Sequence, residues 1–125
     1  MIRQKIQITS EKLADAIIEG IKDKKGLEIT QLGFKKIKNA ICDSFIICHG
    51  NSSTHVEAIA DGLVEYVRIK HGVKPWRSEG YQNAEWVLID YVDVVVHVFQ
   101  QQTRNYYRLE DLWSDAEFKQ FETVE

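Results

Sequence analysis

Two apolar runs lie three residues apart in the second half of the chain, and they constrain its fold more than any other segment. The runs span residues 85–90 and 94–99, and valine, leucine and isoleucine dominate both. Side chains that branch at Cβ favour strands, and so short a connection is typical of an antiparallel hairpin. Because the runs are almost continuously apolar, we expect two central strands that are covered on both faces. Helices are therefore predicted on both sides of the sheet.

The segments before this hairpin predict helices and strands in turn. Apolar residues recur every three or four positions over residues 10–24, which predicts a helix with Ser10 as its N-cap. A second helix is predicted from the apolar stripe that begins at Val56 and from Gly72, which is placed as a C-terminal stop. Further strands are expected at residues 27–32, 45–48 and 76–79.

This order of elements predicts an α/β fold. It gives a three-layer domain in which a mixed five-stranded sheet carries helices on both faces. A chain of 125 residues fits one core, so a single domain over residues 1–125 is expected. Residues 34–41 are interpreted as an irregular connector, and the acidic end from Asp115 to Glu125 as the continuation or frayed end of a last helix.

The charge balance argues against a protein that coats nucleic acids. The net charge is −3 and the isoelectric point is about 5.8, whereas neutralising phosphates usually requires a strong basic excess. Lys35, Lys36 and Lys38 form a basic cluster in the connector. We interpret the cluster as a solvated rim, with a contact to RNA as the alternative.

Sequence features that direct a protein to membranes or out of the cell are not evident. The longest apolar run is far shorter than the roughly 20 residues needed to cross a bilayer. The segment from Met1 to Ile6 has no apolar stretch of the kind found in secretion signals, so a cytoplasmic location is expected. In that reducing compartment Cys42 and Cys48 are expected to be structural thiols, and they have no close-spaced partners for a zinc site.

The strongest catalytic interpretation is a metal-dependent nucleotidyltransferase, because Gly50-Asn51-Ser52-Ser53 after a strand could cradle a phosphate. Such enzymes need paired carboxylates to hold metal ions, but Asp90 and Asp93 are separated by a turn. Helix capping is the simpler role for the two serines. His97 lies in an apolar strand, where a core histidine bonded to a neighbour is expected. No catalytic residue, metal or cofactor is therefore predicted.

Aromatic and arginine side chains around the hairpin make a better case for binding. Trp, Tyr and Arg dominate protein interfaces because they bury a large area and still make directional polar contacts. Trp86 shares one strand face with Leu88, and we expect it to form an exposed surface with Tyr107. For Trp113 a place in the core is preferred. The further candidates around the ends of the strand pair are Tyr91, Asp93, Arg104 and Tyr106.

Over residues 10–113 the chain resembles the ribosomal silencing factor, or Iojap-like, family. The resemblance rests on several motifs, which are weak singly and specific together. They are Asp43-Ser44-Phe45-Ile46-Ile47-Cys48, Gly50-Asn51-Ser52-Ser53-Thr54-His55-Val56, Ala58-Ile59-Ala60-Asp61, Glu79-Gly80, Ala84-Glu85-Trp86-Val87-Leu88-Ile89-Asp90, Asp93-Val94-Val95-Val96-His97-Val98-Phe99, Arg104, and Tyr106-Tyr107-Arg108-Leu109-Glu110-Asp111-Leu112-Trp113.

The resemblance implies a translational repressor with a nucleotidyltransferase-like topology but without the catalytic acids. It implies binding to the large ribosomal subunit through its L-fourteen protein, on the face that meets the small subunit, so that subunit joining is obstructed. It also implies a homodimer when the protein is free. The partner-facing positions that it implies are Trp86, Tyr91, Asp93, Gln100, Arg104, Tyr106 and Tyr107.

Two positions depart from the family pattern. Thr54 stands where an arginine is usual, which weakens any phosphate-binding relic, and Val92 stands where glycine is usual in the hairpin turn. Because valine disfavours positive φ, the geometry of the hairpin turn and the direction of the Asp93 side chain stay open at this point. Two other functions stay open from the sequence: the nucleotidyltransferase, and a dimeric scaffold with no ribosomal role.

Overall fold

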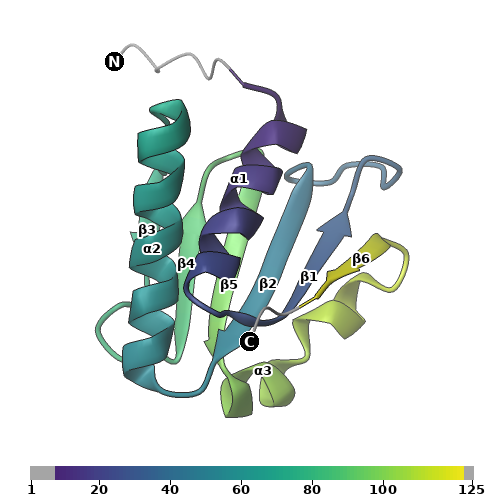
Figure 1. Cartoon of the computed structure of the whole chain (residues 1–125). Coiled ribbons are helices and arrows are strands. Elements are labelled where there is room, and N and C mark those ends of the chain that lie inside the picture. The colour runs from purple at the N-terminus through teal and green to yellow at the C-terminus, as the bar shows by residue number, and fades with distance from the viewer. Residues whose placement is uncertain (1–7, 123–125) are drawn as a thin grey trace.

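A six-stranded mixed sheet organises the chain in the computed structural model (Figure 1). The structure describes residues 8–122. The strands lie in the order β3-β4-β5-β2-β1-β6, and β2 and β5 are the parallel pair. The elements in chain order are α1 (Ser10–Asp23), β1 (Leu27–Gly33), β2 (Ser44–Gly50), α2 (Ser53–His71), β3 (Arg77–Glu79), β4 (Trp86–Asp90), β5 (Val94–Gln100), α3 (Gln101–Tyr107), the 3-10 helix η1 (Leu109–Trp113) and β6 (Glu117–Phe121).

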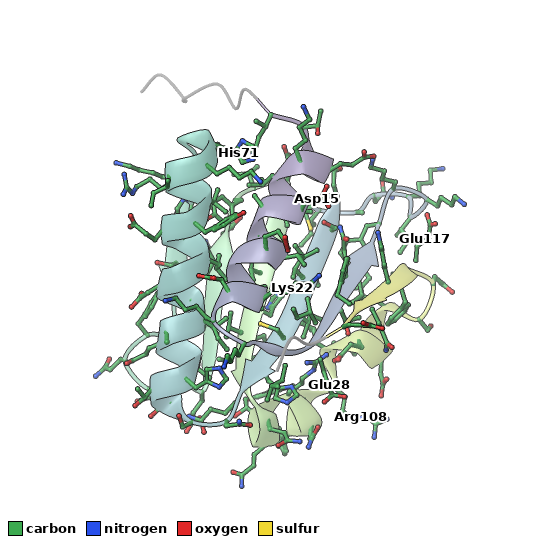
Figure 2. All side chains as sticks on the ribbon, viewed as in Figure 1. Asp15, Lys22, Glu28, His71, Arg108 and Glu117 are labelled. Atoms are coloured by element: carbon green, nitrogen blue, oxygen red, sulfur yellow. The ribbon has the colours of Figure 1, made fainter. Side chains whose placement is uncertain are left out.

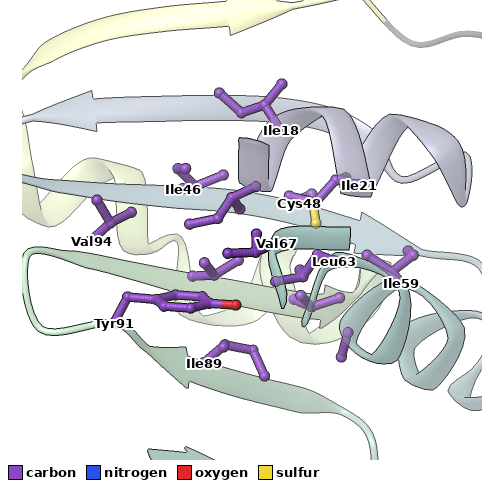
Figure 3. Packing of buried hydrophobic residues seen from close by; sticks show 14 of the residues in the cluster. Ile18, Ile21, Ile46, Cys48, Ile59, Leu63, Val67, Ile89, Tyr91 and Val94 are labelled. Carbon is purple, nitrogen blue, oxygen red and sulfur yellow. The ribbon is translucent and has the colours of Figure 1, made fainter. Parts of the chain in front are cut away.

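The main core lies between one face of the sheet and the helices α1 and α2. The apolar stripe predicted for α1 is buried, and so is the stripe of α2 that begins at Val56 (Figure 3). The two helices approach closely at Gly20, where an added Cβ would lie 2.8 Å from the Cα of Leu63. This contact explains why the α1 stripe is interrupted by a residue without a side chain.

The helix ends follow the sequence signals with one change. The N-cap of α1 is Thr9, whose hydroxyl accepts a hydrogen bond from the backbone N–H of Lys12, so the prediction of Ser10 is wrong by one residue. Ser52 caps α2 by accepting from the N–H of His55. Gly72 ends α2 in the left-handed conformation, as predicted. Among residues 8–122, no helix combines the length and the apolar character that a bilayer crossing requires.

The opposite face of the sheet is covered unevenly. A second apolar cluster forms where the connector and η1 pack over β1 and β2, with Phe34 between Phe45 at 4.9 Å and Trp113 at 5.0 Å between ring centroids. Trp113 is half-buried and packs against this cluster, so the place in the core that was predicted for it holds for one side of its ring. Towards β4 this cover ends, and Trp86 and Leu88 remain half-buried. The expectation that the hairpin strands are covered on both faces is thus wrong for this part of β4.

The C-terminal segment corrects the predicted strand number. Residues 117–121 form β6, which pairs antiparallel with β1, so the sheet has six strands rather than five. The prediction of a continued or frayed helix is wrong for residues 117–121, and the last part of that prediction, residues 123–125, lies outside the described residues. The strand forms because β1 would otherwise leave its second edge unpaired, and unpaired backbone groups at a sheet edge attract another strand.

The predicted antiparallel hairpin is confirmed, and its turn is strained. β4 and β5 pair with Trp86 opposite Phe99 and Asp90 opposite Val95. Between them Val92 has φ of 76°, and the N–H of Asp93 donates to the carbonyl of Tyr91 at 2.9 Å. This is a three-residue turn with its central residue at positive φ, a conformation that is rare and costly for a β-branched side chain.

We expect Val92→Gly to stabilise the protein by about 1 kcal/mol. Valine in the left-handed conformation costs roughly 1–2 kcal/mol, and glycine removes this cost. The extra freedom of glycine in the unfolded chain costs about 0.5–1 kcal/mol, so a net gain in stability remains. Urea unfolding followed by circular dichroism measures the change. Val95→Gly, in the neighbouring extended strand, is the matched control and should destabilise. A lower midpoint for Val92→Gly than for the natural chain would contradict the assigned strain.

Candidate docking face

An apolar surface is open to solvent on the sheet face that the helices α1 and α2 do not cover. Trp86 and Leu88 on β4 share this face with Val95 on β5, and all three are half-buried. Tyr107 at the end of α3 borders it and lies 5.0 Å from Trp86 between ring centroids. We call these four residues, Trp86, Leu88, Val95 and Tyr107, the docking face.

Charged side chains form a rim along β3. The Nε of Arg77 donates to Oδ2 of Asp90 at 3.3 Å, and an Nη of Arg77 pairs with Glu79 at 2.8 Å. The other carboxylate oxygen of Asp90 accepts the N–H of Val92 at 2.8 Å, which ties the rim to the hairpin turn. An apolar centre with a polar rim is the usual anatomy of a protein interface.

A buried histidine supports the centre of the docking face. The indole N–H of Trp86 donates to Nδ1 of His97 at 3.0 Å. The His97 ring is 4% exposed and packs against Phe45 at 4.6 Å and Phe99 at 6.3 Å between centroids. Burial lowers the pKa of His97 to about 4, and the charge of Asp90 opposes this shift only in part. His97 is thus a core histidine bonded to a neighbour, as predicted.

Folding stability should therefore fall as the pH drops below 6.5. The unfolded chain takes up a proton at His97 near pH 6.5, whereas the folded chain resists until about pH 4, so acid favours unfolding between these values. One unit below 6.5 the loss from this group is about 1 kcal/mol. Unfolding midpoints from pH 7.5 to 5.0 measure it. His97→Leu is the control, and an equally steep decline in that variant would contradict the assignment to His97.

The structure divides the seven predicted partner-facing residues between the two ends of the hairpin. Five of them lie at one end: Trp86, Gln100, Arg104, Tyr106 and Tyr107. At this end the Gln100 amide donates to the carbonyl of Ala84, and Tyr106 is 81% exposed. Tyr91 and Asp93 lie at the hairpin turn. At 3.3 Å per residue along β5, the turn is about 20 Å from Trp86.

Two of the seven side chains do not face solvent. Tyr91 is 2% exposed and points into the core beneath α1 and α2 (Figure 3). Arg104 is 8% exposed. A partner therefore cannot reach either side chain in this structure, and we limit the candidate surface to the docking face with Asp93, Gln100 and Tyr106 at its margins.

Arg104 joins α3 to the rest of the molecule. Its guanidinium donates to Glu110 Oε2 through Nε at 3.0 Å and Nη2 at 2.8 Å, and Nη2 also reaches Thr30 Oγ1 at 3.3 Å. Nη1 donates to the Glu28 carbonyl at 2.8 Å and to His49 Nδ1 at 3.0 Å. Glu28 lies at a bulge of β1 with φ of 46°, so Arg104 binds the carbonyl that the bulge turns away from the ladder.

The same contacts decide whether the cleft beside Arg104 can bind an anion. This cleft of about 550 Å³ lies between α3, η1 and β6, and Glu28 and Arg108 both lie at this end of the molecule (Figure 2). Each of the five N–H groups of Arg104 already has an acceptor, so none is left for an anion. Burial and the Arg104 charge both lower the pKa of His49, which keeps its Nδ1 free to accept.

The features of a catalytic site do not come together in the described part of the chain. The Gly50–Ser53 segment serves α2 as a cap, and Asn51 donates its N–H to the ring of His55. Residues 8–122 contain no group of three or more His, Cys, Asp or Glu side chains that could hold a metal ion. In the lysine cluster, Lys35 pairs with Glu11 at 3.1 Å and Lys36 with Glu117 at 3.9 Å. The cluster thus shares its charge with neighbouring acids, as a solvated rim does.

Both cysteines are free thiols, in line with the sequence. Cys48 is buried and Cys42 is half-buried. Burial raises the pKa of Cys42 to about 11 and of Cys48 to about 12, which keeps both protonated and unreactive near neutral pH.

The sequence signals missed part of the docking face. The sequence patterns do not point to Val95 or Arg77, because pairing of β5 with β4 brings Val95 to the face of Trp86 and pairing of β3 with β4 brings Arg77 to Asp90. Alternation also places Tyr91 on the face opposite to Trp86, a signal that was available in the sequence. The role of Arg104 had no such local signal.

Comparisons with known proteins agree on one family. Residues 7–125 match the protein family described as ribosomal silencing factor during starvation. A protein named ribosomal silencing factor from Halalkalibacterium halodurans is 43% identical over 117 residues, which cover 94% of this chain and 98% of that protein. A crystal structure of a protein from Chromobacterium violaceum superposes with a TM-score of 0.80 at 34% identity, covering 86% of this chain and 88% of that one.

A more distant relative carries a name that mentions the ribosome directly. The mouse protein named mitochondrial assembly of ribosomal large subunit protein 1 is 33% identical over 78 residues. The match covers 61% of this chain and 34% of the mouse protein.

Proposed function

The chain belongs to the ribosomal silencing factor family, and from this premise we propose that it represses translation by binding the large ribosomal subunit through its L-fourteen protein. Family membership makes it a ribosome-associated translation repressor with a regulatory role rather than a catalytic one. Bound to the large subunit, the protein would occupy surface that the small subunit needs, so that subunit joining is blocked sterically. This mechanism needs no turnover and no cofactor.

The observation that carries the proposal is the docking face. Trp86 lies at its centre and is flanked by aliphatic and tyrosine side chains, with Arg77 and Glu79 at the rim. Central aromatic residues supply most of the binding energy at many protein interfaces, and a polar rim surrounds them. The name of the mouse relative, which refers to the large ribosomal subunit, supports the choice of subunit.

Three further elements complete the proposal. We keep the cytoplasm as the location, since the protein acts on ribosomes there. A homodimer is proposed for the free protein. The Lys35, Lys36 and Lys38 cluster is proposed to make at most a minor contact with ribosomal RNA, because two of its three charges are shared with acidic neighbours.

Sedimentation of purified ribosomal subunits tests the proposal. We expect the protein to travel with isolated large subunits and, when it is added before small subunits, to reduce the peak of joined ribosomes. Large subunits depleted of the L-fourteen protein serve as the control and should not carry the protein. An undiminished yield of joined ribosomes at saturating protein would overturn the steric mechanism.

A further inference from the structure

We infer that His97 is a positioning residue for docking: it fixes the indole of Trp86 in the orientation that the partner meets. This inference rests on the proposed function. His97 itself is buried and lies beneath the docking face. The contact through which it acts is the 3.0 Å hydrogen bond from Trp86 Nε1 to His97 Nδ1.

The His97 ring is held in place by its surroundings. It packs edge-on against Phe45 on β2 at 4.6 Å between centroids, and it stacks over Phe99 on its own strand. Its backbone lies in the middle of β5, paired with Leu88 on one side and Ile47 on the other. Because the ring of His97 cannot turn, its Nδ1 accepts the indole N–H of Trp86 from one direction only.

The tautomer of His97 follows from this contact. Because the indole can only donate, Nδ1 accepts, and the proton of the neutral ring is on Nε2. Nε2 is buried and has no hydrogen-bond partner within residues 8–122. An unpaired buried N–H costs free energy, so the ring is a poor choice for stability alone. Its contribution is the acceptor that it offers to Trp86.

Trp86 has the freedom that such an acceptor would restrict. The indole is half-buried, with Phe99 at 4.8 Å and Tyr107 at 5.0 Å between centroids. Without His97 Nδ1, the indole N–H could be satisfied by turning towards water. A misoriented indole would present a different edge to the partner, and docking would lose complementarity while the fold persists.

Two substitutions separate positioning from structural support. His97→Leu keeps the volume but removes the acceptor, and we expect it to weaken docking to large subunits roughly three- to tenfold without a loss of stability at neutral pH. His97→Asn offers an oxygen near the position of Nδ1 but leaves a cavity. It should dock close to the natural chain while unfolding more easily. If docking follows stability in these two variants, His97 has only a structural role and the inference fails.

A double-mutant cycle with Trp86→Phe localises the effect. Phenylalanine keeps an aromatic ring and removes the donor, so His97→Leu should cause no further loss of docking in that background. An equal loss in both backgrounds would overturn the inference.

Hydrogen exchange of the indole N–H, measured by NMR, tests the hydrogen bond between Trp86 and His97 in the absence of ribosomes. We expect His97→Leu to accelerate exchange at Trp86 and leave Trp76 unchanged; unchanged exchange at Trp86 would also overturn the inference. A natural chain that fails to bind large subunits but keeps a protected Trp86 indole would instead count against the proposed function.

Discussion

Arg104→Ala is expected to lower the free energy of unfolding by about 3 kcal/mol, more than any other single change considered. The substitution leaves Glu110, whose side chain is 24% exposed, without its cation, and it leaves the Glu28 carbonyl and the Thr30 hydroxyl without their donor. Removing one member of a buried ion pair typically costs roughly 3–5 kcal/mol, and the partial exposure of Glu110 places this case at the lower end. Chemical denaturation at pH 7 measures the loss.

Arg108→Ala is the matched control for Arg104. Arg108 lies one turn further along the chain and pairs with Asp111 at 2.6 Å, but its side chain is 71% exposed (Figure 2). Exposed ion pairs contribute little, so we expect a change below about 1 kcal/mol. Arg104→Lys should fall between the two, because an ammonium group cannot reach acceptors on several sides as the guanidinium does. Equal midpoints for the two alanine variants would show that Arg104 does not hold α3 in place.

Local periodicity explains which parts of the fold were predictable. The stripes of α1 and α2 and the β4–β5 hairpin follow from spacings within one segment, and the structure confirms them. β6 could not be found in this way. Its apolar residues Phe118 and Phe121 are three positions apart, as on a helix, and the strand forms through pairing with β1, which is distant in sequence.

The candidate site shows the same division between local and distant determinants. Trp86 and its neighbour Tyr107 were predicted to share an exposed surface, and the structure brings them into contact. Arg104 looked like an interface residue because composition near Trp86 was the available signal. Its hydrogen-bond partners on β1 and β2 lie 55 to 77 residues away, so its structural role depends on the folded chain.

Val92 illustrates how tertiary context overrides a local preference. Valine disfavours positive φ, yet the turn adopts φ of 76°. Asp90 accepts the N–H of Val92 and is itself held by Arg77, and the register of two central strands fixes both ends of the turn. Valine at this position therefore adds strain to the turn and leaves the hairpin intact.

Trp86→Ala is expected to weaken binding to the large subunit by about 30-fold or more, the largest effect on docking. The central aromatic residue of an interface typically contributes 2 kcal/mol or more, and about 1.4 kcal/mol corresponds to a tenfold change in affinity. Pelleting of the protein with a titration of large subunits measures the change. The same variant should restore subunit joining at protein concentrations where the natural chain prevents it.

Two companion variants separate lost docking from lost folding. Truncating Trp86 also removes packing against Phe99 and His97, so circular dichroism must first confirm that the variant is folded at the assay temperature. Leu88→Arg places a long charged side chain on the docking face without a cavity, and should weaken docking by about tenfold or more because the partner would have to cover this polar group, even if Glu79 opposite it pairs with the charge. Ile69→Ala is the control, since Ile69 is 70% exposed on α2 across the sheet. If Ile69→Ala weakens docking as much as Trp86→Ala does, the partner binds the helical side and the docking face is misassigned.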